Sequence, residues 1–270
     1  MRFKRFLLII GILFLTRITA QSTASKQVTK FVIEAPQLDT TKQIWVYLPK
    51  KYENSKKHYP VIYMHDAQNL FDNETSYVGE WKVDEYLDSL NNNESIIIGI
   101  EHGNEKRIDE LTPYNHAEYG GGKGENYLSF IKHTLKPKID SIYRTLPQPS
   151  NTTLFGSSLG GLISLYGVIK HSDTFGMAGL FSPAFWINPE IYKLVENTNI
   201  PKTSKFYFLV GTAEDESMLP NQIKMIELLK TKGVLEHHIS NNIVKDGQHN
   251  EQFWSKHFGE AYQWLHNNAN

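Results

Sequence analysis

The chain has 270 residues, of which 40% are hydrophobic and 21% are charged, and its formal net charge is -1. This length suffices for one α/β domain with a large core. The near-neutral charge excludes the strong excess of basic residues that is typical of a protein that binds nucleic acid or an anionic lipid surface. The chain contains no cysteine, which excludes disulfides, a thiol nucleophile and a cysteine-linked lipid anchor.

The first twenty residues have the pattern of a secretory signal. A basic start is followed by the apolar run Leu7–Leu15, and Thr19-Ala20-Gln21 offers a small-residue cleavage site. The pattern predicts a signal peptide over residues 1–20, one domain over residues 21–270, and an exported protein, periplasmic or secreted. An uncleaved membrane anchor is the less favoured alternative because the apolar run is short for a membrane span. No stable membrane association is expected after cleavage.

Short apolar runs alternate with longer amphipathic segments along the rest of the chain. Strands are expected at Val28–Glu34, Gln43–Leu48, Tyr59–Met64, Ser95–Ile100, Thr152–Phe155, Met177–Phe181, Phe206–Val210 and Ile239–Val244. Helices are expected at Trp81–Leu90, Asn126–Tyr143, Leu159–Lys170, Met218–Lys232 and Gln252–Leu265. This alternation predicts an α/β fold with a mostly parallel central sheet and helices on both faces.

Two loops are longer than the connections need to be. Residues 102–124 follow the fourth strand, and residues 182–204 follow the sixth. Ligands of open parallel sheets bind at the carboxyl ends of the strands, where both loops begin. Neither loop is long enough for a large helical lid, so we expect an open site.

The segment Gly156-Ser157-Ser158-Leu159-Gly160 stands between an expected strand and an expected helix. The pattern G-x-S-x-G in this context places its central serine on a sharp strand-to-helix turn, with the oxygen above the end of the sheet. Ser158 is therefore the expected nucleophile.

A serine nucleophile needs a base, and the base needs a carboxylate to orient it. In this fold the chain order is serine, acid, histidine. The loop after the seventh expected strand carries Glu214, Asp215 and Glu216, and His249 lies between the last expected strand and the final helix. We take His249 as the base, whereas position alone leaves Glu214 and Asp215 nearly even as the acid.

The oxyanion formed during acyl transfer needs two N–H donors. One is expected from Leu159, at the start of the helix that follows the nucleophile. The other is expected from the loop after the third strand, His65–Asp72. His65 and Asp66 could suggest a metal pair, but no spaced partner supports it, so a structural pair is favoured. No metal site and no cofactor are expected.

Five ordered segments resemble the motifs of the putative-esterase family of α/β-hydrolases, which includes enterochelin-esterase-like hydrolases, feruloyl esterases, S-formylglutathione hydrolase and mycolyltransferases. The segments are His65-Asp-Ala-Gln-Asn-Leu-Phe-Asp72, Arg107 with Glu110-Leu-Thr-Pro113, Gly156-Ser-Ser-Leu-Gly-Gly161, Ser182-Pro-Ala-Phe-Trp186, and Gly247-Gln-His-Asn-Glu251 with Trp254. The resemblance covers about residues 28–266. It implies an α/β-hydrolase fold without a large lid.

The resemblance also implies roles for individual residues. It places the acid on Glu214 and the second oxyanion donor on the backbone N–H of Gln68. Ala67 stands where the family has glycine, so strain is expected if that position needs a positive φ. From its residue type, Arg107 is expected either to bind a carboxylate or polar acyl group of the substrate or to pair with Asp109 or Glu110. Trp186 and Trp81 are candidates for an aromatic acyl pocket, although tryptophan is more often a core residue.

These observations predict an exported serine hydrolase that cleaves a small-molecule carboxylic ester through an acyl-enzyme on Ser158. A siderophore ester and a sugar ester are candidate substrates, and nucleic acid is not an expected partner. An acyltransferase with the same triad and an alcohol or sugar acceptor is the alternative. A non-catalytic binding protein on the same scaffold is disfavoured because no triad member is missing.

Overall fold

The computed structural model describes residues 21–91 and 95–266. The expected signal peptide, residues 1–20, lies outside the described residues. Within them, no helix is both long and apolar enough to cross a membrane.

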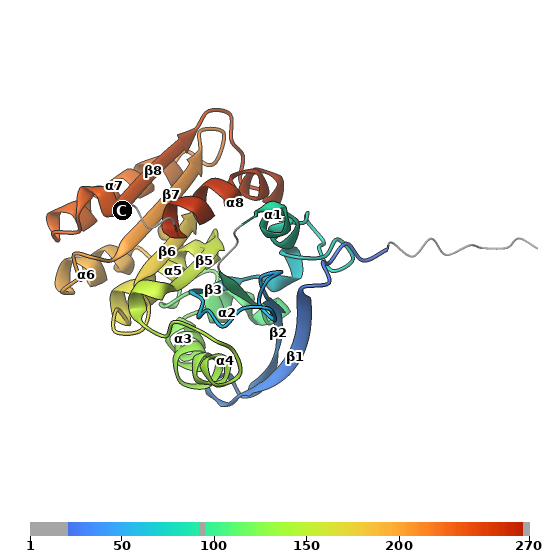
Figure 1. Ribbon diagram of the computed structural model, residues 1–270. Helices are drawn as coiled ribbons and strands as arrows, with labels where there is room; N and C mark the ends of the chain where they lie inside the picture. The colour runs from blue at the N-terminus through green and yellow to red at the C-terminus, as the bar shows by residue number, and fades with distance from the viewer. Residues whose placement is uncertain (1–20, 92–94, 267–270) are drawn as a thin grey trace, which may run out of the picture.

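Eight strands form one sheet in the described part of the chain, in the spatial order β1-β2-β4-β3-β5-β6-β7-β8 (Figure 1). β1 and β4 pair with β2 in antiparallel fashion, and all other neighbouring strands are parallel. The strands are β1 Val28–Ala35, β2 Thr40–Tyr47, β3 Val61–His65, β4 Ile96–Ile100, β5 Thr152–Ser157, β6 Met177–Phe181, β7 Lys205–Gly211 and β8 Ile239–Val244. The predicted α/β fold with a mostly parallel sheet is confirmed.

Helices cover both faces of the sheet. The α-helices are α1 Val83–Ser89, α2 Arg107–Leu111, α3 Gly124–Phe130, α4 Lys136–Ile142, α5 Leu159–Lys170, α6 Glu190–Asn197, α7 Met218–Thr231 and α8 Glu251–His266. Residues of α1 and α8 pack together on one face, and residues of α3 to α7 pack on the other. Figure 1 shows α1 beside α8, although they lie far apart in the sequence.

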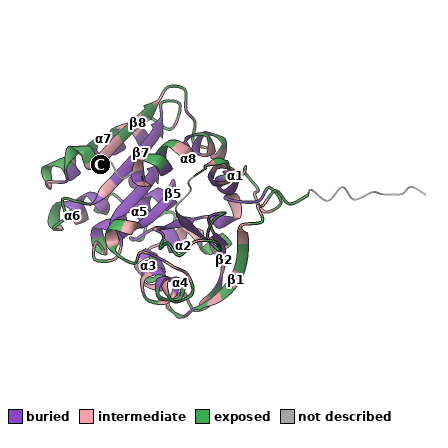
Figure 2. Cartoon of the chain, viewed as in Figure 1, coloured by how far each residue is buried: buried purple, intermediate pink, exposed green. Residues whose placement is uncertain are grey.

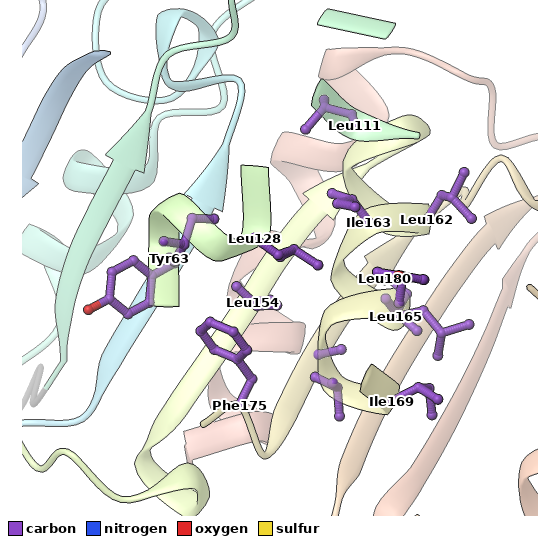
Figure 3. Close-up of a cluster of buried hydrophobic side chains, with 14 of the residues drawn as sticks. Tyr63, Leu111, Leu128, Leu154, Leu162, Ile163, Leu165, Ile169, Phe175 and Leu180 are labelled. Carbon is purple, nitrogen blue, oxygen red and sulfur yellow. The ribbon is translucent and has the colours of Figure 1, made fainter. Parts of the chain in front are cut away.

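The alternation of side chains along the strands produces two cores. In β3, Val61 and Tyr63 join the core under α3 to α7, whereas Ile62 and Met64 join the core under α1 and α8. The central strands are therefore buried on both sides, as Figure 2 shows. Figure 3 shows part of the first core, where Leu128 of α3 lies near Leu154 of β5. The carboxyl ends of β3 to β8, which run parallel to one another, lie at one edge of this sheet.

The two long loops contain helices that the sequence pattern does not predict. α2, of five residues, lies within 102–124, and α6, of eight residues, lies within 182–204. Ile191 and Val195 of α6 are buried and four residues apart, which is a helical spacing too short to stand out in the sequence. Both helices are short, in agreement with the expectation of no large lid.

Candidate active site

Ser158 occupies a strained turn between β5 and α5. Its backbone has φ 55° and ψ -117°, outside the regions that residues other than glycine usually adopt. The turn also brings Gly156 and Gly160 together, because a Cβ built on Gly156 would lie 2.9 Å from the Cα of Gly160. Small residues at both positions therefore permit the turn.

Glu214 and His249 meet at the same edge of the sheet. The Nδ1 atom of His249 lies 2.8 Å from Oε2 of Glu214, and the Glu214 side chain is completely buried. Asp215 is exposed, and its carboxylate accepts hydrogen bonds from the backbone N–H and hydroxyl of Ser217. Of the two acids that position alone leaves open, Glu214 is the one that contacts the histidine.

Glu214 is held by a chain of hydrogen bonds that sequence reasoning does not reveal. Its second oxygen accepts hydrogen bonds of 2.7 Å from the backbone N–H of Gly211 and from the hydroxyl of Ser182. The indole N–H of Trp254 donates to the Ser182 oxygen at 2.9 Å, and the Trp254 ring lies edge-on to His249. Ser182 and Trp254 both lie in the quoted motifs, which is the only signal in the sequence that could have suggested this arrangement.

Ser158 and His249 line one pocket of about 330 Å³. Its wall combines polar groups with apolar side chains, and the other lining residues are His65, Asp66, Asn69, Leu70, Val78, Trp81, His102, Arg107, Ser157, Glu251 and Trp254. The pocket thus collects residues at or after the carboxyl ends of four strands, β3, β4, β5 and β8.

Two backbone segments beside Ser158 carry the expected oxyanion donors. Leu159 is the first residue of α5, so its N–H has no partner within the helix. Gln68 lies in the short 3₁₀ helix Ala67–Asn69 that follows β3. The amide side chain of Gln68 exchanges two hydrogen bonds of 3.2 Å with the backbone of His102, which ties this helix to the loop after β4.

The positive φ in this loop belongs to Asp66 (φ 58°), and Ala67 is not among the residues of positive φ. The expected strain at Ala67 therefore does not arise. Its methyl group is buried against β4, where Gly99 leaves room for it.

Arg107 pairs with Asp66, which corrects the expectation of a pair with Asp109 or Glu110. Its Nε and Nη2 atoms donate to the two carboxylate oxygens at 2.7 and 2.8 Å. Burial alone would raise the pKa of Asp66, but the adjacent guanidinium outweighs it and lowers that pKa. Asp66 is therefore an anion that fixes Arg107 at the pocket wall.

His65 has a structural environment. Its Nδ1 atom lies 2.8 Å from the Tyr127 hydroxyl, and its Nε2 atom lies 3.1 Å from the Ser164 hydroxyl. Ser164 donates to the carbonyl of Gly160, so we assign the ring proton to Nε2. Burial lowers the pKa of His65 to about 4, which keeps the ring neutral. Each ring nitrogen of His65 thus lies within hydrogen-bonding distance of a protein hydroxyl.

The two tryptophans proposed for the acyl pocket have different positions. Trp81 is buried, lines the pocket and stacks on Phe181. Trp186 is 45% exposed, packs edge-on against Tyr119 and does not line the pocket. The structure therefore brings Trp81 to the site and leaves Trp186 on the surface beyond it.

A family model described as "Putative esterase" matches residues 35–265. The chain is 28% identical over 234 residues to the protein of Bacillus subtilis (strain 168) named "Uncharacterized protein YbbA", covering 82% of this chain and 91% of that protein. It is 25% identical over 162 residues to the iron(III) salmochelin esterase of Escherichia coli O6:H1, covering 54% of this chain but only 38% of that protein.

The fold is similar to that of a solved structure of related size. The crystal structure of the BES protein from Bacillus cereus superposes with a TM-score of 0.73 at 19% identity, covering 93% of this chain and 98% of that chain. At this identity the likeness establishes the shared fold.

Proposed function

Since the chain belongs to the putative esterase family and is a carboxylic ester hydrolase, we propose that it works through an acyl-enzyme on Ser158. The observation that carries the proposal is the contact of 2.8 Å between Glu214 and His249, at a pocket that Ser158 also lines. This chemistry needs a serine nucleophile, a histidine that takes its proton, and a carboxylate that orients the histidine.

In the proposed mechanism Ser158 Oγ attacks the ester carbonyl while His249 Nε2 takes its proton. Glu214 accepts the Nδ1 proton in a hydrogen bond, which fixes the tautomer and stabilises the imidazolium. The N–H groups of Leu159 and Gln68 bind the oxyanion. His249 then protonates the leaving alcohol, which leaves the acyl group on Ser158. Water attacks this acyl-enzyme while His249 takes a proton from it, and the acid departs as His249 returns the proton to Ser158.

We expect Ser158→Ala to lower the kcat for p-nitrophenyl acetate hydrolysis by a factor on the order of 10⁴.

Glu214→Gln removes the anion beside His249 and should lower kcat by a factor of similar size. Asp215→Asn is the matched control, because the Asp215 carboxylate is exposed and hydrogen-bonds only Ser217 in the described structure. A fluorophosphonate probe should label the wild type and not Ser158→Ala; unchanged turnover in that variant would overturn the proposal.

The substrate we propose is a small-molecule ester with a polar acyl group. The pocket is small and carries the Arg107 guanidinium and the Glu251 carboxyl beside the apolar Trp81. Burial raises the pKa of Glu251, so this group can donate as well as accept a hydrogen bond. The salmochelin esterase among the relatives supports including ferric siderophore esters in the assay panel, beside sugar esters.

We also propose that the protein is exported, on the basis of the basic and apolar pattern in residues 1–20. N-terminal sequencing of the mature protein from the extracytoplasmic fraction should then begin close to Gln21. Recovery of the full chain from the cytoplasm alone would contradict export and would leave the proposed chemistry unaffected.

A further inference from the structure

The positive charge of the active-site pocket is already paired within the protein. Arg107 is the one lysine or arginine that lines the pocket in the described part of the chain. Its Nε and Nη2 atoms bind the two carboxylate oxygens of Asp66, which also lines the pocket and whose side chain is 12% exposed. The ion pair as a whole therefore presents no net charge to a substrate.

This ion pair lies beside the proposed nucleophile. A Cβ built on Gly160, two residues after Ser158, would lie 3.7 Å from the Oδ2 atom of Asp66. Asp66 also directly precedes the short 3₁₀ helix Ala67–Asn69, which carries the proposed oxyanion donor Gln68. The charge of Asp66 thus acts on whatever group is bound next to Ser158.

A second carboxyl group, that of Glu251, lines the same pocket and has no cation of its own. No lysine or arginine forms an ion pair with it among the described residues. Burial raises the pKa of Glu251, to which the nearby Asp66 carboxylate adds and which Arg107 opposes. The pocket therefore holds two carboxyl groups against one guanidinium, and it has no surplus positive charge whether Glu251 is ionised or protonated.

The free polar atoms of the pocket include both donors and acceptors. His102 accepts the backbone N–H of Asn104 on Nδ1 at 2.9 Å, so we assign its proton to Nε2. This Nε2–H group and the Nη1 group of Arg107 have no hydrogen-bond partner within the described residues. Acceptors are the oxygens of Glu251 and of the Asn69 amide. Hydroxyl and amide groups can donate and accept in such a pocket, whereas a carboxylate can only accept.

On the basis of the proposed hydrolysis at Ser158, we propose that Asp66 determines the charge specificity of the pocket. By occupying Arg107 it makes the enzyme select esters whose acyl group carries an uncharged hydroxyl or amide over esters whose acyl group is anionic. A free guanidinium binds a carboxylate through two parallel hydrogen bonds, and Asp66 already makes that contact. A substrate anion would lose its hydration and meet two carboxyl groups instead.

Two p-nitrophenyl esters of equal acyl length test this specificity. One is the mono-p-nitrophenyl ester of adipic acid, whose free carboxyl is ionised at neutral pH, and the other is its terminal amide. Each kcat/KM is divided by the rate constant of spontaneous hydrolysis of the same ester. The wild type should prefer the amide by about 10- to 100-fold, as expected from the repulsion of one charge near a protein surface.

Asp66→Asn removes the negative charge and leaves Arg107 free to bind a substrate anion. Asparagine tolerates the backbone of this position, which has φ 58°. The variant should lower the preference for the amide by about tenfold or more. A purely structural role of Asp66 would instead slow both esters alike and leave their ratio unchanged.

Glu251→Gln removes the second carboxyl group and should shift the ratio in the same direction by a smaller factor, so it serves if Asp66→Asn fails to fold. Asp109→Asn is the matched control. Asp109 is two residues from Arg107, but it pairs with Lys123 at 2.6 Å and does not line this pocket, so its variant should keep the wild-type ratio.

Equal corrected rates for the two esters in the wild type, or a preference for the carboxylate, would overturn the inference. An unchanged ratio in Asp66→Asn would overturn it as well. Hydrolysis of p-nitrophenyl acetate, whose acyl group carries no polar substituent, reports separately on the proposed function. Wild-type activity on that ester together with equal rates on the adipate pair would therefore reject the role of Asp66 and retain the hydrolysis at Ser158.

Discussion

At the scale of single residues, Ala67 and Gly99 form a complementary pair. Ala67 replaces the glycine that the family motif has in the proposed oxyanion loop, and its methyl group is completely buried. A Cβ built on Gly99 of β4 would lie 2.9 Å from the Cβ of Ala67 and 2.9 Å from the ring of Phe71. The two positions therefore have room for one methyl group between them.

Gly99→Ala should destabilise the fold by about 1–3 kcal/mol, because the added methyl overpacks this contact. Ala67→Gly in the same chain should recover part of that loss, since it removes one of the two colliding atoms. Urea unfolding of both single variants and of the double variant measures the coupling. Strictly additive effects would show that the two methyl groups do not compete for the same space.

The sequence predicts the positions of the proposed catalytic residues but not the contacts that hold the residues around them. The order of serine, acid and histidine along the chain predicts Ser158 and His249 and leaves Glu214 and Asp215 open as the acid, and the family resemblance then favours Glu214. The partner of Arg107 is Asp66, 41 residues earlier, and local reasoning favours the nearer carboxylates Asp109 and Glu110. Such a pairing depends on the crossing of two loops, which residue spacing does not encode.

At the scale of elements, α2 is fastened to the sheet by a buried ion pair. Lys42 of β2 donates to both oxygens of Glu110, at 2.5 and 2.6 Å, and both side chains are 4% exposed. The same carboxylate accepts the backbone N–H of Gly103. Since Arg107 begins α2, this pair also fixes the helix that presents Arg107 to the pocket.

Lys42→Met should destabilise the protein by about 3–5 kcal/mol, because it leaves the Glu110 charge buried without its partner. Adding Glu110→Leu should restore most of the loss, since both charges are then absent. Denaturant midpoints of the two variants compare these outcomes. A stable Lys42→Met protein would show that the Glu110 carboxylate does not need its partner.

Short elements are also where sequence prediction falls short. The long apolar strands and the amphipathic helices α5, α7 and α8 are predicted to within a few residues. α2 and α6 are missed because five to eight residues give too few helical turns for a periodic signal. Their stability comes from tertiary contacts such as the burial of Ile191 in the core.

At the scale of the whole molecule, one sheet edge gathers the site from distant parts of the chain. Ser158 follows β5, Glu214 follows β7 and His249 follows β8, because parallel strands all present their carboxyl ends at that edge. The predicted fold class alone therefore predicts that these three residues lie at one edge of the sheet.

The three proposed catalytic residues are unequally supported by the sheet. β5 is hydrogen-bonded on both sides, by β3 and β6, whereas β8 is bonded only by β7 and leaves Ile243 44% exposed. Local opening begins where a sheet has fewest bonds and contacts. Fraying of β8 would carry the base away while the nucleophile stays in place, so heat inactivation would precede the melting of the fold.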